Sequence, residues 1–328
     1  MSSVLVTARI FGHLSDKSLD MFTRNGLDVV PNPYKGKGLS ENELIGLIKG
    51  VDALLTGVDQ VTAKVIRAAD RLKVISKFGT GVDNIDLDAA TENGIIVTNT
   101  PGMNANAVAD MTFSLMLGIA RKVTLAFDQV RAGRWSLIVG TEIWKKSLGL
   151  IGLGKIGKGV AIRASGFNMK LLAYDKFPDK KFAKERNIKL VTLNQLLQAS
   201  DFISIHVPLT PDTENLIGKC QFEMMKTSAF LINTARGGIV DENALYDALV
   251  SGRIAGAAVD VLKEEPPKKN RLVELENFII TPHISSFTKE AIRNTERVSA
   301  QNIIDLLKGG HSPYIVNPEV LTRRRPLG

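Results

Sequence analysis

Short apolar runs recur along this chain and alternate with longer stretches in which apolar residues return every three or four positions. The short runs have the length and composition of buried strands, and the longer stretches have the period of amphipathic helices. Strands and helices that alternate in this way are typical of a parallel sheet covered by helices. The alternation runs from about residue 3 to 100 and again from about 148 to 280, which predicts an α/β fold of two doubly wound parallel sheets.

In the first run, Ser40 and Glu43 fit a capping box at a helix start, and Thr62 is expected to cap the next helix. Strands are expected at Val4–Val6, Leu27–Val30, Ala53–Leu55, Leu72–Ile75 and Ile95–Val97.

A long helix is expected between the two runs, from about Asn104 to Lys122, and another near the end, from about Thr288 to Leu307. The tail beyond Asn317, which contains three successive arginines, is expected to fray. Strands of the second run are expected at Gly149–Ile151, Leu171–Tyr174, Phe202–Ile205, Ala229–Ile232, Ala257–Val259 and Phe278–Ile280.

The second run opens on a glycine-rich turn. Gly152, Gly154 and Gly157 match G-x-G-x-x-G directly after an apolar strand and directly before a helical pattern. In such a motif the glycines allow a tight turn, approach of a pyrophosphate and close packing of helix on strand, and the helix start offers N–H groups to phosphates. Asp175 ends the next strand, where a carboxylate binds a ribose hydroxyl and favours NAD over NADP, although Lys176 follows it.

Composition narrows the class of protein. The 328 residues are 44% hydrophobic and 23% charged, as in ordinary globular proteins. The net charge of +8 is spread in small clusters, which favours attraction of anionic substrates over nucleic-acid binding. The single Cys220 gives neither a disulfide nor a metal-ligand spacing.

Nothing in the hydrophobic pattern indicates a membrane protein. No apolar run approaches the roughly 18 residues of a membrane span. The N-terminal residues resemble a strand more than a signal peptide. We therefore expect a cytoplasmic protein.

Three reactive side chains follow strands of the second run: Arg236, Glu265 and His283. Ligands of open α/β sheets bind outside the carboxyl ends of the strands. A cation, a carboxylate and an imidazole placed there would suit hydride transfer on a small anionic substrate.

Several blocks of the chain resemble the D-isomer-specific 2-hydroxyacid dehydrogenases, and the resemblance covers nearly the whole sequence. The block at residues 77–86 most resembles the D-3-phosphoglycerate dehydrogenase branch of that family. The blocks are residues 77–86, 99–104, 148–157, 233–238, 260–267 and 281–283.

The resemblance implies a discontinuous, flavodoxin-like substrate domain formed by residues 1–100 and 288–328. It implies a Rossmann domain for NAD at residues 101–287, and a homodimer joined through the nucleotide domains. The helix after Asn104 and the segment Trp135–Trp144 would make that contact.

The resemblance also implies roles for the site residues. His283 would be the acid/base, since an imidazole changes charge near neutral pH. Glu265, with Glu264 as its rival, would orient the ring, and Arg236 would grip the substrate carboxylate with a planar fork. Substrate would also meet Lys77, Thr80 and Gly81. Asp260 would bind the nicotinamide amide, Pro208 would lie on the adenine side, and His206 would line the cofactor site. No metal is expected. The full set of cofactor residues would be Gly152, Gly154, Lys155, Ile156, Gly157, Asp175, Val207, Pro208, Thr234, Ala235, Arg236, Asp260 and His283.

The chain departs from the family pattern at two places, and the second leaves the substrate open. Asp110 stands where the family has glutamate, which suggests a supporting role. The turn after the third strand, Thr56-Gly57-Val58, lacks the arginine that phosphoglycerate enzymes use for phosphate, and Lys77 could bind a second anion instead. Reductases of hydroxypyruvate, glyoxylate or phosphonopyruvate are therefore alternatives, and an NAD-sensing corepressor is a remote one.

Overall fold

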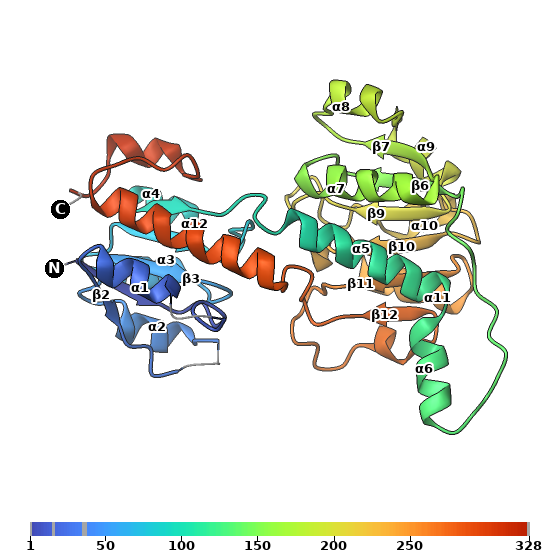
Figure 1. Cartoon of the computed structure of the whole chain (residues 1–328), viewed down its shortest axis with the longest axis horizontal. Helices are drawn as coiled ribbons and strands as arrows, with labels where there is room; N and C mark the ends of the chain where they lie inside the picture. The colour runs from blue at the N-terminus through green and yellow to red at the C-terminus, as the bar shows by residue number, and fades with distance from the viewer. Residues whose placement is uncertain (1, 15–16, 35–37, 327–328) are drawn as a thin grey trace. The chain divides into compact units, whose positions relative to one another are not determined.

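The computed structural model describes residues 2–14, 17–34 and 38–326. The chain divides into two compact units, one formed by Met1–Asn104 with Thr288–Gly328 and the other by Ala105–Phe287. Each unit contains one parallel sheet with helices packed on it (Figure 1).

The first unit has a five-stranded parallel sheet in the order β2-β1-β3-β4-β5. Its strands are β1 Ser2–Val6, β2 Leu27–Val30, β3 Ala53–Thr56, β4 Val74–Lys77 and β5 Ile96–Thr98. All five predicted strands are therefore present. Its helices are α1 Lys17–Arg24, α2 Glu41–Leu47, α3 Ala63–Ala68, α4 Leu87–Glu92 and α12 Lys289–Leu307.

Two hydrophobic clusters cover the two faces of this sheet. Because side chains alternate along a strand, Leu5 and Leu54 pack with α2, α3 and α4, while Val4 and Leu55 pack with α1 and α12 on the opposite face. Figure 1 shows α12, near the red end of the colour scale, beside α1. The final helix thus completes the core of the N-terminal sheet, although more than 180 residues of the other unit separate them in sequence.

The predicted helix starts are confirmed. Ser40 and Glu43 form both hydrogen bonds of a capping box before α2. Thr62 and Thr288 accept backbone N–H groups at the starts of α3 and α12. Local polar signals therefore set these boundaries.

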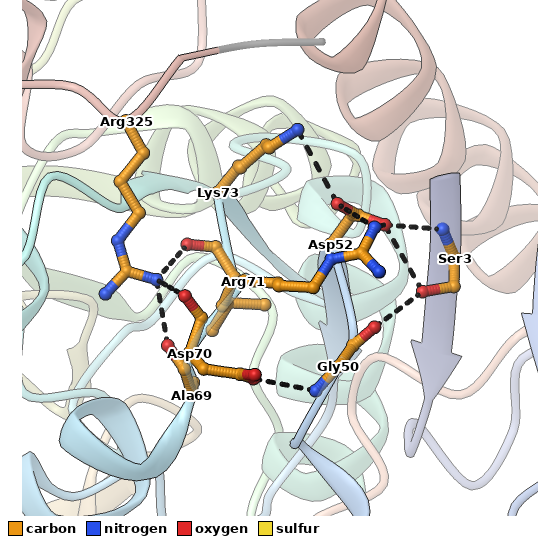
Figure 2. A network of polar contacts seen from close by, with 9 residues as sticks. Ser3, Gly50, Asp52, Ala69, Asp70, Arg71, Lys73 and Arg325 are labelled. Carbon is orange, nitrogen blue, oxygen red and sulfur yellow. Dashed lines mark hydrogen bonds and ion pairs between the residues drawn. The ribbon is translucent and has the colours of Figure 1, made fainter. Parts of the chain in front are cut away.

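The prediction that the tail frays is wrong for the described residues up to 326. A short 3₁₀ helix, Pro318–Thr322, buries Val320 completely. Arg325 then donates side-chain hydrogen bonds to the backbone oxygens of Ala69, Asp70 and Leu72, at 2.8–3.1 Å (Figure 2). A fourth bond runs from its Nε to the oxygen of Asn93 at 2.9 Å. Backbone carbonyl groups at the ends of α3 and α4 thus bind the side chain of Arg325, which the sequence pattern had placed in a frayed tail.

A buried carboxylate near this tail ties β1 to the turn after α3. Asp52 is 1% exposed and accepts from the Ser3 N–H at 2.9 Å and from Arg71 at 3.0 Å (Figure 2). Burial acts to raise the pKa of Asp52, but the Ser3 N–H and the Arg71 and Lys73 cations outweigh it, so the pKa lies below its usual value. Asp52 is therefore held as a carboxylate between β1 and the turn after α3.

The second unit has a seven-stranded parallel sheet in the order β12-β11-β10-β9-β6-β7-β8. The strand order reverses direction at β6, which makes the β6–β9 boundary the switch point where doubly wound sheets bind ligands. Its strands are β6 Ser147–Ile151, β7 Lys170–Tyr174, β8 Lys189–Leu190, β9 Phe202–Ile205, β10 Phe230–Asn233, β11 Gly256–Val259 and β12 Phe278–Ile280. Its α-helices are α5 Ala105–Ala120, α6 Val123–Arg131, α7 Lys155–Ala164, α8 Lys180–Glu185, α9 Leu193–Ala199, α10 Lys219–Met224 and α11 Glu242–Val250.

Strand β8 and helix α6 fall outside the alternation of strands and helices that the sequence predicts. Both residues of β8 are exposed, and α6 buries none of its residues. Neither segment therefore contributes to the hydrophobic core of the unit. Within the described ranges, no helix has both the length and the apolar character needed to cross a membrane.

Candidate active site

The glycine-rich turn joins β6 to α7 at the switch point. Gly152 has φ +98°, and a Cβ on it would lie 2.6 Å from the carbonyl oxygen of His206. A Cβ on Gly157 would overlap the carbonyl of Gly152. Around Gly154, in contrast, a Cβ would meet no atom within 4 Å. The outer glycines are therefore required by packing, and the middle one leaves the backbone open to a ligand.

The open glycine begins a helix. Gly154 caps α7 without a side-chain hydrogen bond, and Lys155 and Ile156 form its first turn. The N-terminal end of a ten-residue helix carries a partial positive charge suited to phosphate. The turn thus fits the pyrophosphate of a dinucleotide.

Asp175 lies directly beside this turn. One carboxylate oxygen accepts the Leu153 N–H at 2.7 Å, and the other accepts the Phe177 N–H at 2.7 Å. These bonds fix the carboxylate at the end of β7, where a ribose is expected. Lys176, the cation next to Asp175 that weakens the predicted preference for NAD over NADP, forms an exposed ion pair with Asp212 at 3.0 Å.

The other residues of this unit that are predicted to bind the cofactor follow β9, β10 and β11, so they lie at the same carboxyl edge of the sheet. Val207 and Pro208 follow β9, and Thr234 and Ala235 follow β10. The Thr234 hydroxyl lies 3.1 Å from that of Thr112 on α5. The edge therefore presents one continuous set of loops.

His206 stands at the end of β9 and is not suited to proton transfer at neutral pH. Its Nε2 lies 2.8 Å from the Ser204 hydroxyl, and its Nδ1 is buried with no hydrogen-bond partner among the described residues. Burial lowers the pKa of His206 to about 3. His206 is thus a neutral side chain beside the glycine turn.

Glu265 and His283 form the central pair of the candidate active site. His283 Nδ1 lies 2.7 Å from Glu265 Oε2, and Glu265 Oε1 accepts the Leu262 N–H at 2.9 Å. Burial acts to raise the pKa of Glu265, but the hydrogen bond and charge of His283 outweigh it, and the Arg236 charge adds to the lowering. Glu265 is therefore held as a carboxylate, with the guanidinium in electrostatic reach.

Glu264, the alternative to Glu265 as the predicted partner of His283, makes a different contact. Glu264 forms an exposed ion pair with Lys268 at 2.8 Å. Of the two adjacent acids, Glu265 alone contacts His283 among the described residues.

Gly237, which has no predicted role of its own, brings Arg236 toward this pair. A Cβ on Gly237 would overlap the backbone of Leu262 and Lys263. The turn after Arg236 therefore packs directly against the loop that carries Glu265. Asn233 shapes the same turn, since it accepts the Ala235 N–H at 3.0 Å and donates to the Arg236 oxygen at 2.8 Å.

Asp260 organises the turn that carries His283. Asp260 is 1% exposed; its oxygens accept the Ile284 and Ser285 N–H groups at 2.9 and 2.7 Å and the hydroxyl of Thr281. The turn holds His283 at φ +54°, a left-handed conformation that non-glycine residues rarely adopt. The structure thus gives Asp260 a positioning role, while its contact with nicotinamide stays a prediction.

The predicted substrate residues Lys77, Thr80 and Gly81 belong to the first unit, unlike the three candidate catalytic residues. Thr80 is exposed, and its carbonyl accepts from Asn99 at 2.7 Å. Lys77 is only 8% exposed; its ammonium donates to the Gly57 carbonyl and, at 2.7 Å, to Asn84. Lys77 therefore holds the loop after β3.

Asp110 links two helices of the second unit. Its carboxylate on α5 accepts from Arg163 on α7 at 2.6 Å. The supporting role expected for Asp110 thus takes the form of a bond to the helix that follows the glycine turn. No group of three or more His, Cys, Asp or Glu side chains in the described ranges could hold a metal ion.

Comparison with known proteins defines the family. Residues 113–285 match the profile of the D-isomer specific 2-hydroxyacid dehydrogenase NAD-binding domain. A glyoxylate reductase from Thermococcus litoralis is 42% identical over 318 residues, which cover 92% of this chain and 96% of that protein. The chain belongs to the D-isomer specific 2-hydroxyacid dehydrogenases.

Other relatives differ in length and activity. A D-3-phosphoglycerate dehydrogenase from Archaeoglobus fulgidus is 43% identical over 300 residues, covering 90% of this chain and 56% of that protein. The chain thus spans little more than half the length of this relative. The structure of a D-lactate dehydrogenase from Aquifex aeolicus, solved with NAD and lactic acid, superimposes with a TM-score of 0.82 at 28% sequence identity. The superposition covers 100% of this chain and 99% of the chain of that enzyme.

Proposed function

We propose that this protein is an NAD-dependent D-2-hydroxyacid dehydrogenase that also reduces 2-oxo acids. The observation that carries the proposal is the 2.7 Å hydrogen bond between His283 and Glu265. It lies at the carboxyl edge of the sheet whose switch point holds the glycine-rich turn. Family membership supports the same reaction.

His283 serves as the acid/base. Its Nδ1 is committed to Glu265, which leaves Nε2 to exchange a proton with the C2 oxygen of the substrate. During reduction the imidazolium donates this proton, and during oxidation the neutral ring accepts it. The Glu265 carboxylate stabilises the imidazolium and fixes the ring orientation.

Arg236 binds the substrate carboxylate and polarises the C2 oxygen, since a guanidinium offers two parallel N–H donors. Backbone N–H groups near Thr80 and Gly81 hold the same carboxylate.

NAD, when bound, supplies or accepts the hydride at C2. The chain holds its pyrophosphate at Gly154, Lys155 and Ile156, and its adenosine ribose at Asp175. The carboxylate of Asp175 repels a 2′-phosphate, which favours NAD over NADP. Val207, Pro208, Thr234, Ala235 and Asp260 complete the binding site.

The substrate lies among the small acids that relatives use. Relatives of comparable identity are named glyoxylate reductase and D-3-phosphoglycerate dehydrogenase. Glyoxylate, hydroxypyruvate, phosphohydroxypyruvate and phosphonopyruvate are therefore the acids to test.

The test offers each of these acids with NADH and with NADPH and follows absorbance at the nicotinamide band. We expect reduction of at least one acid, with NADH preferred. A folded protein that binds NADH and reduces none of them would contradict the proposal.

We also propose a homodimer joined through the second unit. Trp135, Leu137 and Val139 are 90, 101 and 84% exposed, and Phe127 and Val130 of α6 are more than half exposed. Such a contiguous apolar segment is typical of a protein interface. Sedimentation should show a dimer for the protein and a monomer for a Trp135→Ser/Leu137→Ser variant; a monomeric native protein would refute the proposal.

A further inference from the structure

The loop after β1, residues 7–13, lies at the carboxyl edge of the first sheet beside the loops expected to bind substrate. Strand β1 pairs with β3, and β3 pairs with β4, all in parallel. The carboxyl ends of parallel neighbours meet at one edge. The loops that begin at Thr7, Gly57 and Phe78 are therefore neighbours.

The loop is fixed at one end by the turn after β3. The Thr7 N–H donates to the Leu55 oxygen at 2.9 Å. A Cβ on Gly57 would lie 3.4 Å from the Ala8 Cα. The backbone at Ala8 thus touches the turn where related phosphoglycerate enzymes would carry an arginine.

The loop is fixed at its other end by the loop that is expected to bind the substrate carboxylate. The ring of Phe11 meets that of Phe78 edge-on, with centroids 6.3 Å apart, and also stacks on Phe22 at 5.9 Å. Phe78 directly precedes Gly79, Thr80 and Gly81. Arg9 therefore stands between two anchored points that border the expected substrate carboxylate.

Arg9 is exposed, and within the described ranges its side chain makes no hydrogen bond or ion pair. The other cation of this edge, Lys77, is buried and donates to Gly57 and Asn84. The nearby carboxylate of Asp59 is 3% exposed and accepts the Leu39 N–H at 2.9 Å, so it is engaged in the interior. Arg9 is thus the side chain of these loops that can present a positive fork to a ligand.

We propose that Arg9 is a specificity-determining residue that binds a phosphate or phosphonate group attached to C3 of the substrate. The inference rests on the proposed reaction. Arg9, from the loop after β1, would take the place of the arginine that is missing after β3. A guanidinium matches three-oxygen anions through two parallel hydrogen bonds. Glyoxylate, which lacks C3, would not engage Arg9.

The experiment compares kcat/KM of the native enzyme, Arg9→Gln and Arg9→Lys. The substrates are phosphohydroxypyruvate, phosphonopyruvate, hydroxypyruvate and glyoxylate. For Arg9→Gln we expect a loss of about 10- to 100-fold with at least one of the phosphorus-bearing acids, the size of a lost charged hydrogen bond. Glyoxylate and hydroxypyruvate should change less than about twofold, and Arg9→Lys should recover part of the loss.

Arg67→Gln is the matched control, because Arg67 is an exposed arginine of the same unit on α3. It should leave all four substrates unchanged. Unchanged glyoxylate reduction also shows that each variant is folded.

Three results would overturn the inference: equal losses for all substrates in Arg9→Gln, no loss with either phosphorus-bearing acid, or a native enzyme that reduces glyoxylate but neither of those acids. Failure of the native enzyme to reduce any of the four acids would instead contradict the proposed function itself. The two failures are therefore distinguishable.

Discussion

The carboxyl edges of the two sheets carry polar residues in different states. In the second unit, Glu265 and His283 are bonded to each other at 2.7 Å, and Asp260 fixes the turn beneath them. In the first unit, Lys77 is turned into the protein, while Thr80 and Arg9 are exposed. One edge is preassembled, and the other offers backbone groups and solvated side chains.

This difference separates reaction from selection. A hydride transfer at C2 needs the same acid/base and carboxylate clamp for every 2-hydroxy acid, so those groups gain from rigid placement. The substituent on C3 differs between acids, and the exposed loops of the first unit can vary without disturbing the reaction. Changes in the second unit should therefore affect all substrates alike.

The largest effect is expected for His283→Ala. Loss of a general acid/base should lower kcat by about 10²- to 10⁴-fold, while NADH affinity, measured by fluorescence titration, should change little. His311→Ala, at an exposed histidine of the first unit that lies outside the loops expected to bind substrate, serves as the control. If cofactor affinity fell as much as the rate, His283 would be a binding residue and the division between the units would fail.

Arg236→Lys should follow, with kcat/KM lower by about 10²-fold, because the variant keeps the charge and loses the bidentate geometry. The loss should be similar for glyoxylate and for longer acids. Near-normal kinetics would show that charge alone suffices at this position.

Asp52→Asn should destabilise the first unit and leave the chemistry intact. Asp52 is buried but its partner Arg71 is 56% exposed, so loss of the charged hydrogen bonds should cost about 1–3 kcal/mol, which a urea titration would detect as a lower midpoint. Because the folded pKa of Asp52 is lowered, its contribution is present above the carboxyl pKa of the unfolded chain and is lost as pH falls through the folded value. The variant should thus show a weaker acid dependence of stability, and an unchanged one would exclude this role.

The smallest effect is expected for Asp175→Ala, which should shift the NADH-to-NADPH preference by about tenfold, or roughly 1.4 kcal/mol. Lys176→Ala is the control, since Lys176 is paired with Asp212. If Asp175→Ala left the preference unaltered, the ribose assignment would be contradicted.

Much of the fold is predictable from the sequence because buried strands are short, apolar and bounded by polar turns. Every expected strand is present, with shifts of one or two residues, as at β10. The elements that escaped prediction, β8 and α6, bury almost nothing. The tail was misjudged because the bonds of Arg325 go to backbone carbonyls, which no side-chain pattern reveals.

The site residues likewise divide into features that the sequence predicts and features that only the structure shows. Motifs identify the glycine turn and the three candidate catalytic residues, since each has a characteristic sequence around it. The contact of Gly237 with Leu262, the left-handed turn at His283 and the inward orientation of Lys77 depend on tertiary packing. Sequence alone therefore could not show that Lys77 is committed to the protein.

The central claim is that the second unit sets the reaction independently of the substrate. The most direct test measures kcat/KM of the native enzyme and of His283→Ala with glyoxylate and with each longer acid that the native enzyme reduces. The account predicts a large loss by the same factor, within about threefold, for every substrate. A loss confined to one substrate, or an active His283→Ala variant, would contradict it.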